Sequence, residues 1–265
     1  MTSLTTNTAA EGYKESSLPV QNESGKTFIR VNVNPQPGDT ILDLGCGTGG
    51  LSAYLAELVG PKGKVVGVDP DKERLQLARQ SYGDIKNLSF IEGSSSQFPG
   101  IRSEMYDIVF SNYVIQWIPD KDNAFQNMYT SLKSGGKVAA QYVSYLYPFM
   151  LNAFQELNPE KAAQIIGMFN FEERAKIEQY CSAAGFHIIN SYDTESAQFV
   201  FESTDGFLKW LWSTTNGLFD PKLVTEERLQ RYHPYSSPTG GKPLDFRGIK
   251  EETTVCRLLA VKKVY

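Results

Sequence analysis

Two aspartates and the glycine-rich loop between them are the residues of this sequence that point most directly to chemistry. Asp43 lies inside a short apolar run, and the loop that follows it, residues 45–50, has almost no side-chain bulk. Asp69 ends the next apolar run. A glycine corner after a buried strand lets a ligand approach the backbone closely. The first aspartate favours a positively charged ligand, and the second is placed to accept the hydroxyls of a ribose.

The glycine spacing also has a second interpretation. Gly45-x-Gly47-x-x-Gly50 satisfies the fingerprint of a dinucleotide-binding loop, so an NAD(P)-dependent oxidoreductase stays open as an alternative. Asp43 argues against it, because a carboxylate beside the loop would repel a pyrophosphate but attract an ammonium and a sulfonium. Together the two acids predict an adenosyl ligand with a positively charged amino-acid tail.

Four motifs in this order resemble those of the class I S-adenosylmethionine-dependent methyltransferases. Residues 43–49 are similar to their first motif, and residues 67–70 to the second, where the acid takes the ribose. Residues 90–99 resemble the third-strand motif beside the adenine, and 106–117 resemble the fourth strand and the loop that touches the methionine part. The resemblance covers about residues 36 to 145. It implies methyl transfer with S-adenosyl-L-methionine as the cofactor.

This resemblance also implies a set of cofactor-binding residues. The sequence departs from the family pattern at Ser94 and Ser95. These serines stand where an acid commonly accepts a hydrogen bond from the adenine amino group. A serine hydroxyl can still accept a hydrogen bond. The implied cofactor-binding residues are Asp43, Gly45, Cys46, Gly47, Asp69, Pro70, Gly93, Ser94, Ser95, Asn112 and Tyr113.

Gln116 and Trp117 follow the fourth strand and are the expected catalytic residues. A similar pair lies beside the substrate in the small-molecule carboxyl methyltransferases that this segment resembles, those acting on juvenile hormone acids and on aconitate. Both side chains donate hydrogen bonds without carrying charge. A carboxylate needs only donors that aim it, whereas a hydroxyl needs a base, for which His233 and the tyrosines are the few candidates. We therefore expect a carboxylate oxygen as the acceptor.

Other functions stay open beside this one. Within methyltransferases, N-, C- and hydroxyl O-methylation are alternatives, and so is a cofactor-binding module without catalysis. The net charge of −4, without a run of like charges, argues against nucleic acid and anionic membranes and favours a small-molecule substrate. Trp210, Trp212 and Phe207 could form an apolar wall for a hydrophobic substrate, or they could belong to a core. The three cysteines are dispersed and there are only two histidines, so we expect no metal site and a reducing, cytoplasmic setting without a signal peptide. The oligomeric state is left open.

The elements that must position these residues alternate between strand and helix. They predict an α/β fold, a doubly wound, mainly parallel, seven-stranded Rossmann-like sheet with an antiparallel last strand. We expect one domain over residues 1–265, with a lid at 12–35, where Tyr13 and Gln21 are candidates for cofactor contact, and cap insertions at 145–170 and 202–252. The lid segment has an alternative interpretation as a helix on the sheet without ligand contact. The expected strands are 41–44, 64–69, 88–91, 106–111, 138–143, 186–201 and 254–261.

Overall fold

The computed structural model describes residues 8–12, 21–194, 197, 198, 201, 203–232 and 252–264. These residues divide into two compact units. The larger draws its described residues from 21–144, 170–194 and 255–265, and the smaller from 1–20, 145–169 and 195–254. The described residues of the predicted cap insertions fall in the smaller unit, apart from Asn170, whereas those of the predicted lid are divided between the two. The expectation of one domain with a lid stays a prediction.

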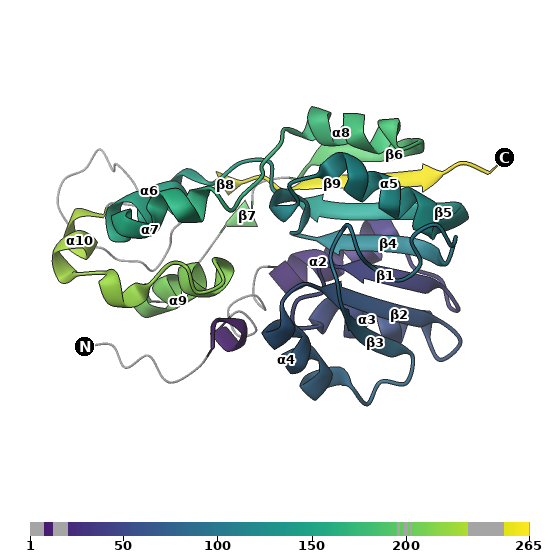
Figure 1. The fold of residues 1–265 in the computed structure, drawn as a ribbon, viewed down its shortest axis with the longest axis horizontal. Helices are drawn as coiled ribbons and strands as arrows, with labels where there is room; N and C mark the ends of the chain where they lie inside the picture. The colour runs from purple at the N-terminus through teal and green to yellow at the C-terminus, as the bar shows by residue number, and fades with distance from the viewer. Residues whose placement is uncertain are drawn as a thin grey trace. The chain divides into compact units, whose positions relative to one another are not determined.

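The larger unit is built around a seven-stranded sheet (Figure 1). Its strands are β1 (Thr40–Leu44), β2 (Lys64–Asp69), β3 (Leu88–Glu92), β4 (Tyr106–Asn112), β5 (Leu132–Tyr142), β6 (Phe186–Asp193) and β9 (Cys256–Lys262). They follow the order β3-β2-β1-β4-β5-β9-β6, in which the first five are parallel and β9 is antiparallel to both its neighbours. This confirms the predicted fold. The chain order reverses between β1 and β4, and in such sheets ligands bind at the carboxyl ends of the strands at that point.

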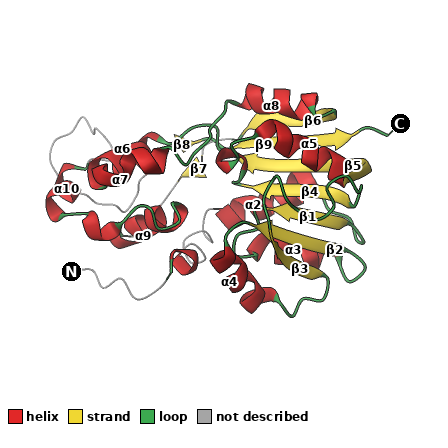
Figure 2. Cartoon of the chain, in the orientation of Figure 1, coloured by secondary structure: helices red, strands yellow, loops and turns green. Residues whose placement is uncertain are grey.

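Helices cover both faces of this sheet (Figure 2). They are α2 (Glu23–Phe28), the π-helical turn η2 (Ile29–Val33), α3 (Gly50–Val59), α4 (Lys72–Tyr82), the 3₁₀ turn η3 (Ile115–Trp117), α5 (Lys121–Ser131) and α8 (Arg174–Ala183). Ile41 of β1 packs with α2 and α3 on one face, while Leu42 and Leu44 pack with α5 and α8 on the other. Because β1 is buried on both faces, its sequence is a nearly continuous apolar run.

The smaller unit is mainly helical and has an aromatic core of its own. It contains α6 (Pro148–Leu157), α7 (Pro159–Ile166), α9 (Thr204–Thr214), the 3₁₀ turn η4 (Pro221–Leu223), α10 (Glu226–Arg231) and a two-stranded sheet of β7 (Ala197–Gln198) and β8 (Glu252–Thr253). The rings of Phe149 and Trp210 stack with centroids 6.1 Å apart. The Tyr232 hydroxyl, in the same cluster, donates to the Phe149 carbonyl oxygen at 3.0 Å. Trp210 is only 4% exposed, so its main role is in this core.

β5 begins earlier than the sequence indicated. The strand was predicted to begin at Val138, after a glycine turn. In the structure Leu132 already pairs with β4, and the chain bulges outward before pairing resumes at Lys137. Gly135, with a φ of 78°, lies in this bulge. The turn therefore exists, but it interrupts a strand that begins before it.

The long strand predicted over 186–201 is wrong. β6 ends at Asp193, and β7 belongs to the separate two-stranded sheet. Asp193 pairs with Cys256, which is the first residue of β9. Among the described residues, no strand partner of β6 continues beyond this pair apart from the bond of the Thr194 N–H to the Val255 carbonyl, so the strand ends there. Among the described residues, no helix combines the length and the apolar character needed to cross a bilayer.

We expect Ile177→Ala, in α8, to lower the free energy of unfolding by about 2–5 kcal/mol, because its side chain is fully buried in the core under β4, β5 and β9. Ile189→Ala is the matched control, since Ile189 is 57% exposed on β6 and should cost less than about 1 kcal/mol. Urea unfolding followed by circular dichroism measures both values. Equal losses would contradict the assignment of this core.

Candidate functional site

The loop between β1 and α3 is shaped by glycines that other residues cannot replace. Gly45 has a φ of 80°, and a Cβ there would lie 2.2 Å from the Cγ2 atom of Val114. Gly49, with a φ of 83°, is the N-cap of α3, and a Cβ there would lie 2.7 Å from the Phe90 ring. The backbone N–H groups of Gly45 and Cys46 both donate to the Val68 carbonyl oxygen, at 2.7 and 3.0 Å. These contacts hold the loop against the end of β2.

Asp69 joins this loop to the end of β2. The Gly47 N–H donates to Asp69 Oδ2 at 2.8 Å, and the Asp71 N–H donates to Oδ1 at 2.9 Å. The residue is 5% exposed, and burial raises the pKa of its carboxyl, although the two N–H groups and Arg74 oppose the rise. Each carboxylate oxygen keeps a second lone pair, so both can still accept a hydroxyl. Pro70, which follows, is exposed.

Asp43 is the other acid of the site and lies on the neighbouring strand. It pairs in register with Gly67, two residues before Asp69. Asp43 is 2% exposed, and Ser52 Oγ in α3 donates to its Oδ2 at 2.5 Å. Burial raises the pKa of Asp43 to about 7; the Ser52 hydrogen bond lowers it and the charge of Asp69 raises it. Burial and both carboxylates also raise the pKa of the Cys46 thiol, so this thiol stays protonated. A cationic ligand would relieve the repulsion between the two acids.

The third motif forms a tight turn after β3. A Cβ on Gly93 would lie 2.3 Å from the Gln97 carbonyl oxygen, so only glycine fits there. The Ser94 N–H donates to the Gln97 carbonyl at 2.8 Å, and its hydroxyl lies 3.0 Å from that of Ser96. The Ser95 carbonyl accepts from Asn127 Nδ2 at 3.0 Å. The Ser94 hydroxyl is half-buried and holds its own turn, which leaves it one more lone pair for a ligand.

Asn112 ends β4, and Tyr113, which follows it, has an unusual backbone. Tyr113 has a φ of 58°, in the left-handed region that a bulky residue rarely adopts, and its N–H donates to the Gln141 carbonyl at 2.6 Å. Asn112 Nδ2 donates to the Gln21 carbonyl at 3.3 Å, and its Oδ1 accepts from Gln141 Nε2 at 2.8 Å. Such strain is retained where the surrounding structure requires it, often at ligand sites.

Gln116 is buried in η3, and only one end of its amide is engaged. Its Nε2 donates to the Tyr113 carbonyl at 2.9 Å, whereas its Oε1 is buried and accepts no hydrogen bond from any described residue. Asn170 holds the backbone of η3 in place, because its N–H donates to the Gln116 carbonyl at 2.7 Å. Asn170 is held in turn by Lys121, whose Nζ donates to the Asn170 carbonyl at 2.5 Å. Trp117 is half-buried beside it.

The structure thus brings Asp43, Cys46, Gly47 and Asp69 together around one loop. The residues after β3 and β4 follow strands of the same sheet and lie at the same edge, where the carboxyl ends of parallel strands meet. His187 is the second residue of β6, lies at the opposite edge and is exposed. Tyr13 and His233 lie outside the described residues.

The sequence interpretation missed the residues that support this site. Ser52, nine positions after Asp43, lies in the first turn of α3, and its side chain faces the buried acid. A serine at that point of a helix following a glycine loop was a usable signal. Gln141 and Arg257 gave no comparable signal. Gln141 bonds to Asn112 and Arg257 to Gln141, and the fold brings these residues together from distant parts of the sequence.

The residues present fit an adenosyl ligand with a cationic tail. Two buried acids lie on adjacent strands, and the loop between them has no room for a Cβ at Gly45 or Gly49. A pyrophosphate would place negative charge beside Asp43, whose carboxyl already resists ionisation. The donor set therefore favours S-adenosylmethionine over a dinucleotide. Among the described residues, no cluster of acids, cysteines and histidines could hold a metal ion.

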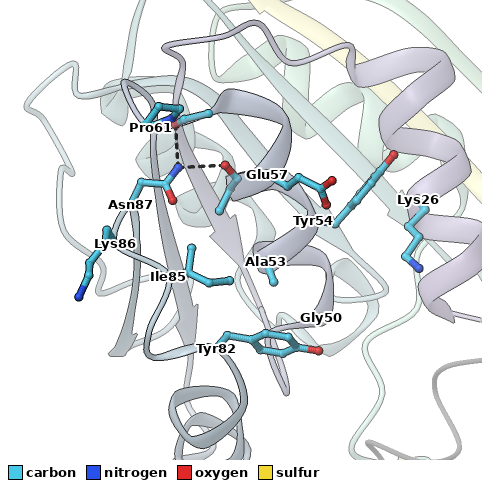
Figure 3. Close-up of a pocket in the computed structure, with 12 residues that line it drawn as sticks. Lys26, Gly50, Ala53, Tyr54, Glu57, Pro61, Tyr82, Ile85, Lys86 and Asn87 are labelled. Atoms are coloured by element: carbon cyan, nitrogen blue, oxygen red, sulfur yellow. Dashed lines mark hydrogen bonds between the residues drawn. The ribbon is translucent and has the colours of Figure 1, made fainter.

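A separate hollow of about 690 Å³ runs along α3 (Figure 3). Lys26 of α2 and Tyr54 of α3 line one side of it, and Tyr82 and Asn87 line the other. Asn87 Nδ2 donates to two carbonyl oxygens at the end of α3, at 2.9 and 2.8 Å. None of the implied cofactor-binding residues lines this hollow, and the loop between the two acids meets it only at its last residue, Gly50.

Comparisons with known proteins agree with this geometry. A family model described as a methyltransferase domain matches residues 35–200. The chain is 37% identical over 115 residues to an arsenite methyltransferase of Halobacterium salinarum, covering 43% of this chain and 29% of that protein. It is 37% identical over 114 residues to a demethylmenaquinone methyltransferase of Oceanobacillus iheyensis, covering 42% of this chain and 47% of that protein. The match therefore spans less than half of either relative.

The fold has solved counterparts too. A solved complex of a methyltransferase activator with a putative methyltransferase from Haloferax volcanii aligns with a TM-score of 0.63 and 18% identity, covering 96% of each chain. At this identity the likeness shows the fold.

We expect Gly45→Ala to raise the dissociation constant of S-adenosylhomocysteine by more than about tenfold, because the added methyl group would displace Val114 and the loop. Gly38→Ala is the matched control: Gly38 also has a positive φ, 96°, but a Cβ there meets nothing within 4 Å. It should cost about 1–2 kcal/mol of stability and leave the affinity unchanged. Isothermal titration calorimetry measures the affinities, and equal effects of the two variants would contradict the assigned loop geometry.

Asp43→Asn should stabilise the free protein at pH 8 while weakening cofactor binding. Since the pKa of Asp43 is raised to about 7, its contribution to stability is complete below pH 4 and is lost as the pH rises towards 7. The variant has no carboxyl group to ionise at this position. Its free energy of unfolding should therefore exceed that of the wild type by an amount that grows between pH 4 and 7, to on the order of 2–4 kcal/mol. Thermal unfolding at pH 5 and pH 8 measures it, with the exposed Asp84→Asn as the control. A pH-independent difference would refute this account of Asp43.

Proposed function

Because this chain belongs to the family of S-adenosylmethionine-dependent methyltransferase domains, we propose that it transfers a methyl group to a small organic molecule. The observation that carries the proposal is the pair of buried carboxylates, Asp43 and Asp69, on adjacent strands beside a loop that cannot accommodate a Cβ at Gly45. Their low exposure strengthens the attraction for a cationic ligand, since charges interact more strongly away from water.

The roles of the residues follow from their chemistry. When bound, S-adenosylmethionine supplies an electrophilic methyl group that a lone pair of the acceptor displaces from sulfur. Asp69 would accept the ribose hydroxyls through the lone pairs that the Gly47 and Asp71 N–H groups leave free. Asp43, held by Ser52, would balance the positive charge of the ligand. The turn at Gly93 and Ser94 would border the adenine, and Asn112 and Tyr113 the methionine part.

The substrate class is proposed to be a small molecule. The net charge of −4, without a run of like charges, argues against nucleic acid as the substrate, and relatives of this domain include enzymes named for arsenite and for demethylmenaquinone. We do not transfer those substrates to this chain, because the matched stretch is less than half of each relative. The described part of this chain gives no support for a thiolate-rich metalloid site, since its three cysteines are buried and form no ligand cluster.

A carboxylate oxygen is the proposed acceptor. At the described carboxyl edge of the sheet no histidine is available as a base, and a carboxylate needs none. Gln116 Nε2 keeps one N–H after donating to Tyr113, and Trp117 carries an indole donor. A hydroxyl acceptor is a second candidate, favoured by one observation: the buried Gln116 Oε1 accepts from no described residue and would suit a hydroxyl donor.

Setting and partners belong to the same proposal. All three cysteines are free thiols, which suits a reducing, cytoplasmic setting. The Haloferax volcanii structure is a complex with an activator protein, so a protein activator is a second kind of partner to test in the assay below.

The test incubates the full chain with S-adenosylmethionine carrying a labelled methyl group and a metabolite extract, followed by mass spectrometry. We expect a labelled methyl ester of a small acid. Gln116→Glu should lower kcat/KM for a carboxylate by about 100-fold, because it sets like charges together. A hydroxyl substrate should lose much less, because it suffers only from the lost hydrogen bond to the Tyr113 carbonyl and can still donate to the glutamate.

Gln126→Glu is the matched control, since it makes the same chemical change at an exposed position of α5. Binding of NAD in place of S-adenosylhomocysteine would refute the proposal. Cofactor binding without any labelled product, with and without added activator protein, would identify a non-catalytic module instead.

A further inference from the structure

Four polar side chains form a row across the sheet at its carboxyl edge. Asn112 of β4 pairs in register with Gln141 of β5, Gln141 with Arg257 of β9, and Arg257 with Tyr192 of β6. Residues directly opposite each other in neighbouring strands project from the same face. That face is the one covered by α2, because the Arg257 guanidinium lies 5.2 Å from the centre of the Phe28 ring.

Three of these side chains make hydrogen bonds that run in one direction. Arg257 can only donate, and its Nε donates to Gln141 Oε1 at 2.8 Å. This orients the fully buried Gln141 amide, so that its Nε2 donates to Asn112 Oδ1 at 2.8 Å and to Ser24 Oγ at 3.1 Å. Asn112 is oriented in turn, and its Nδ2 donates to the Gln21 carbonyl at 3.3 Å. The guanidinium therefore sets the orientation of both amides.

The last acceptors of this relay lie at the beginning of α2. Close packing leaves this helix turn little freedom: a Cβ on Gly25 would lie 2.5 Å from Leu51 Cδ1 and 3.1 Å from Asn112 Nδ2. The Asn22 amide lies 3.3 Å from where a Cβ on Gly50 would be. Gly50 and Leu51 begin α3, directly after the glycine loop of the candidate site. The relay thus holds the first turn of α2 against the start of α3.

From these contacts we infer that Arg257 and Gln141 are positioning residues for cofactor binding. They act through Asn112 and the first turn of α2, and they do so from β5 and β9, on the other side of β4 from the strands that carry Asp43 and Asp69. The inference rests on the proposed function for the identity of the ligand. It assigns cofactor affinity to a pair of side chains outside the four motifs of the sequence.

The decisive variant is Gln141→Glu. A glutamate can accept from Arg257, which keeps that contact and its contribution to the fold, but an ionised glutamate cannot donate to Asn112 or Ser24. We expect its dissociation constant for S-adenosylhomocysteine to rise about tenfold, in line with the loss of one well-placed hydrogen bond to a site residue. Arg257→Leu should give a similar rise, and Arg257→Lys, which restores a donor, should recover most of the affinity.

Tyr192→Phe is the matched control. Its hydroxyl belongs to the same row but donates to Asn32 Oδ1, at 3.1 Å, and lies outside the relay. It should leave the affinity within about twofold of wild type. A purely structural role of the relay would lower the melting temperature of Gln141→Glu and Arg257→Leu without changing the affinity of the folded protein, and that result would overturn the inference.

A measurement on the wild-type chain covers the case of a variant that fails to fold. Coupling is reciprocal, so if docking of α2 favours the cofactor, the cofactor must favour docking of α2. We expect S-adenosylhomocysteine to slow amide hydrogen exchange across residues 21–28. Binding without any slowing there would overturn this inference but leave the proposed function standing. No binding by the wild-type chain would refute both.

Discussion

The burial of two acids on neighbouring strands is the constraint on which the rest of the site depends. Asp43 and Asp69 repel each other away from water, and burial raises the pKa of both. The protein offsets this cost with donors that belong to the loop and its helix, the Ser52 hydroxyl and the Gly47 N–H. The free protein therefore holds a site that is electrostatically incomplete, and a ligand with positive charge completes it.

The parts of this site that could be predicted are local in sequence. Asp43 and the glycine loop lie within one strand, turn and helix, and Asp69 ends the next strand. Each has a physical reason that can be stated without the fold, because a sharp turn needs glycine and a buried strand needs apolar residues. The antiparallel direction of the last strand, β9, was also predicted.

The parts that could not be predicted depend on partners far apart in sequence. The end of β6 depends on where β9 begins, and the bulge of β5 depends on which residues face β4. The relay joins residues separated by 116 and 29 positions, and no pattern in either segment indicates the other. The aromatic residues of α9 also gave no decision between a core and a pocket, and only the stacking of Trp210 on Phe149 answers the question for that residue.

The points where the chain leaves and re-enters the sheet unit have a further consequence. Thr194 and Val255, which bound the second excursion, are joined by a backbone hydrogen bond of 2.8 Å from the Thr194 N–H. An excursion whose ends already touch can change in length or content at little entropic cost to the framework. The residues between Thr194 and Val255 can therefore differ between related proteins while the seven-stranded sheet stays the same.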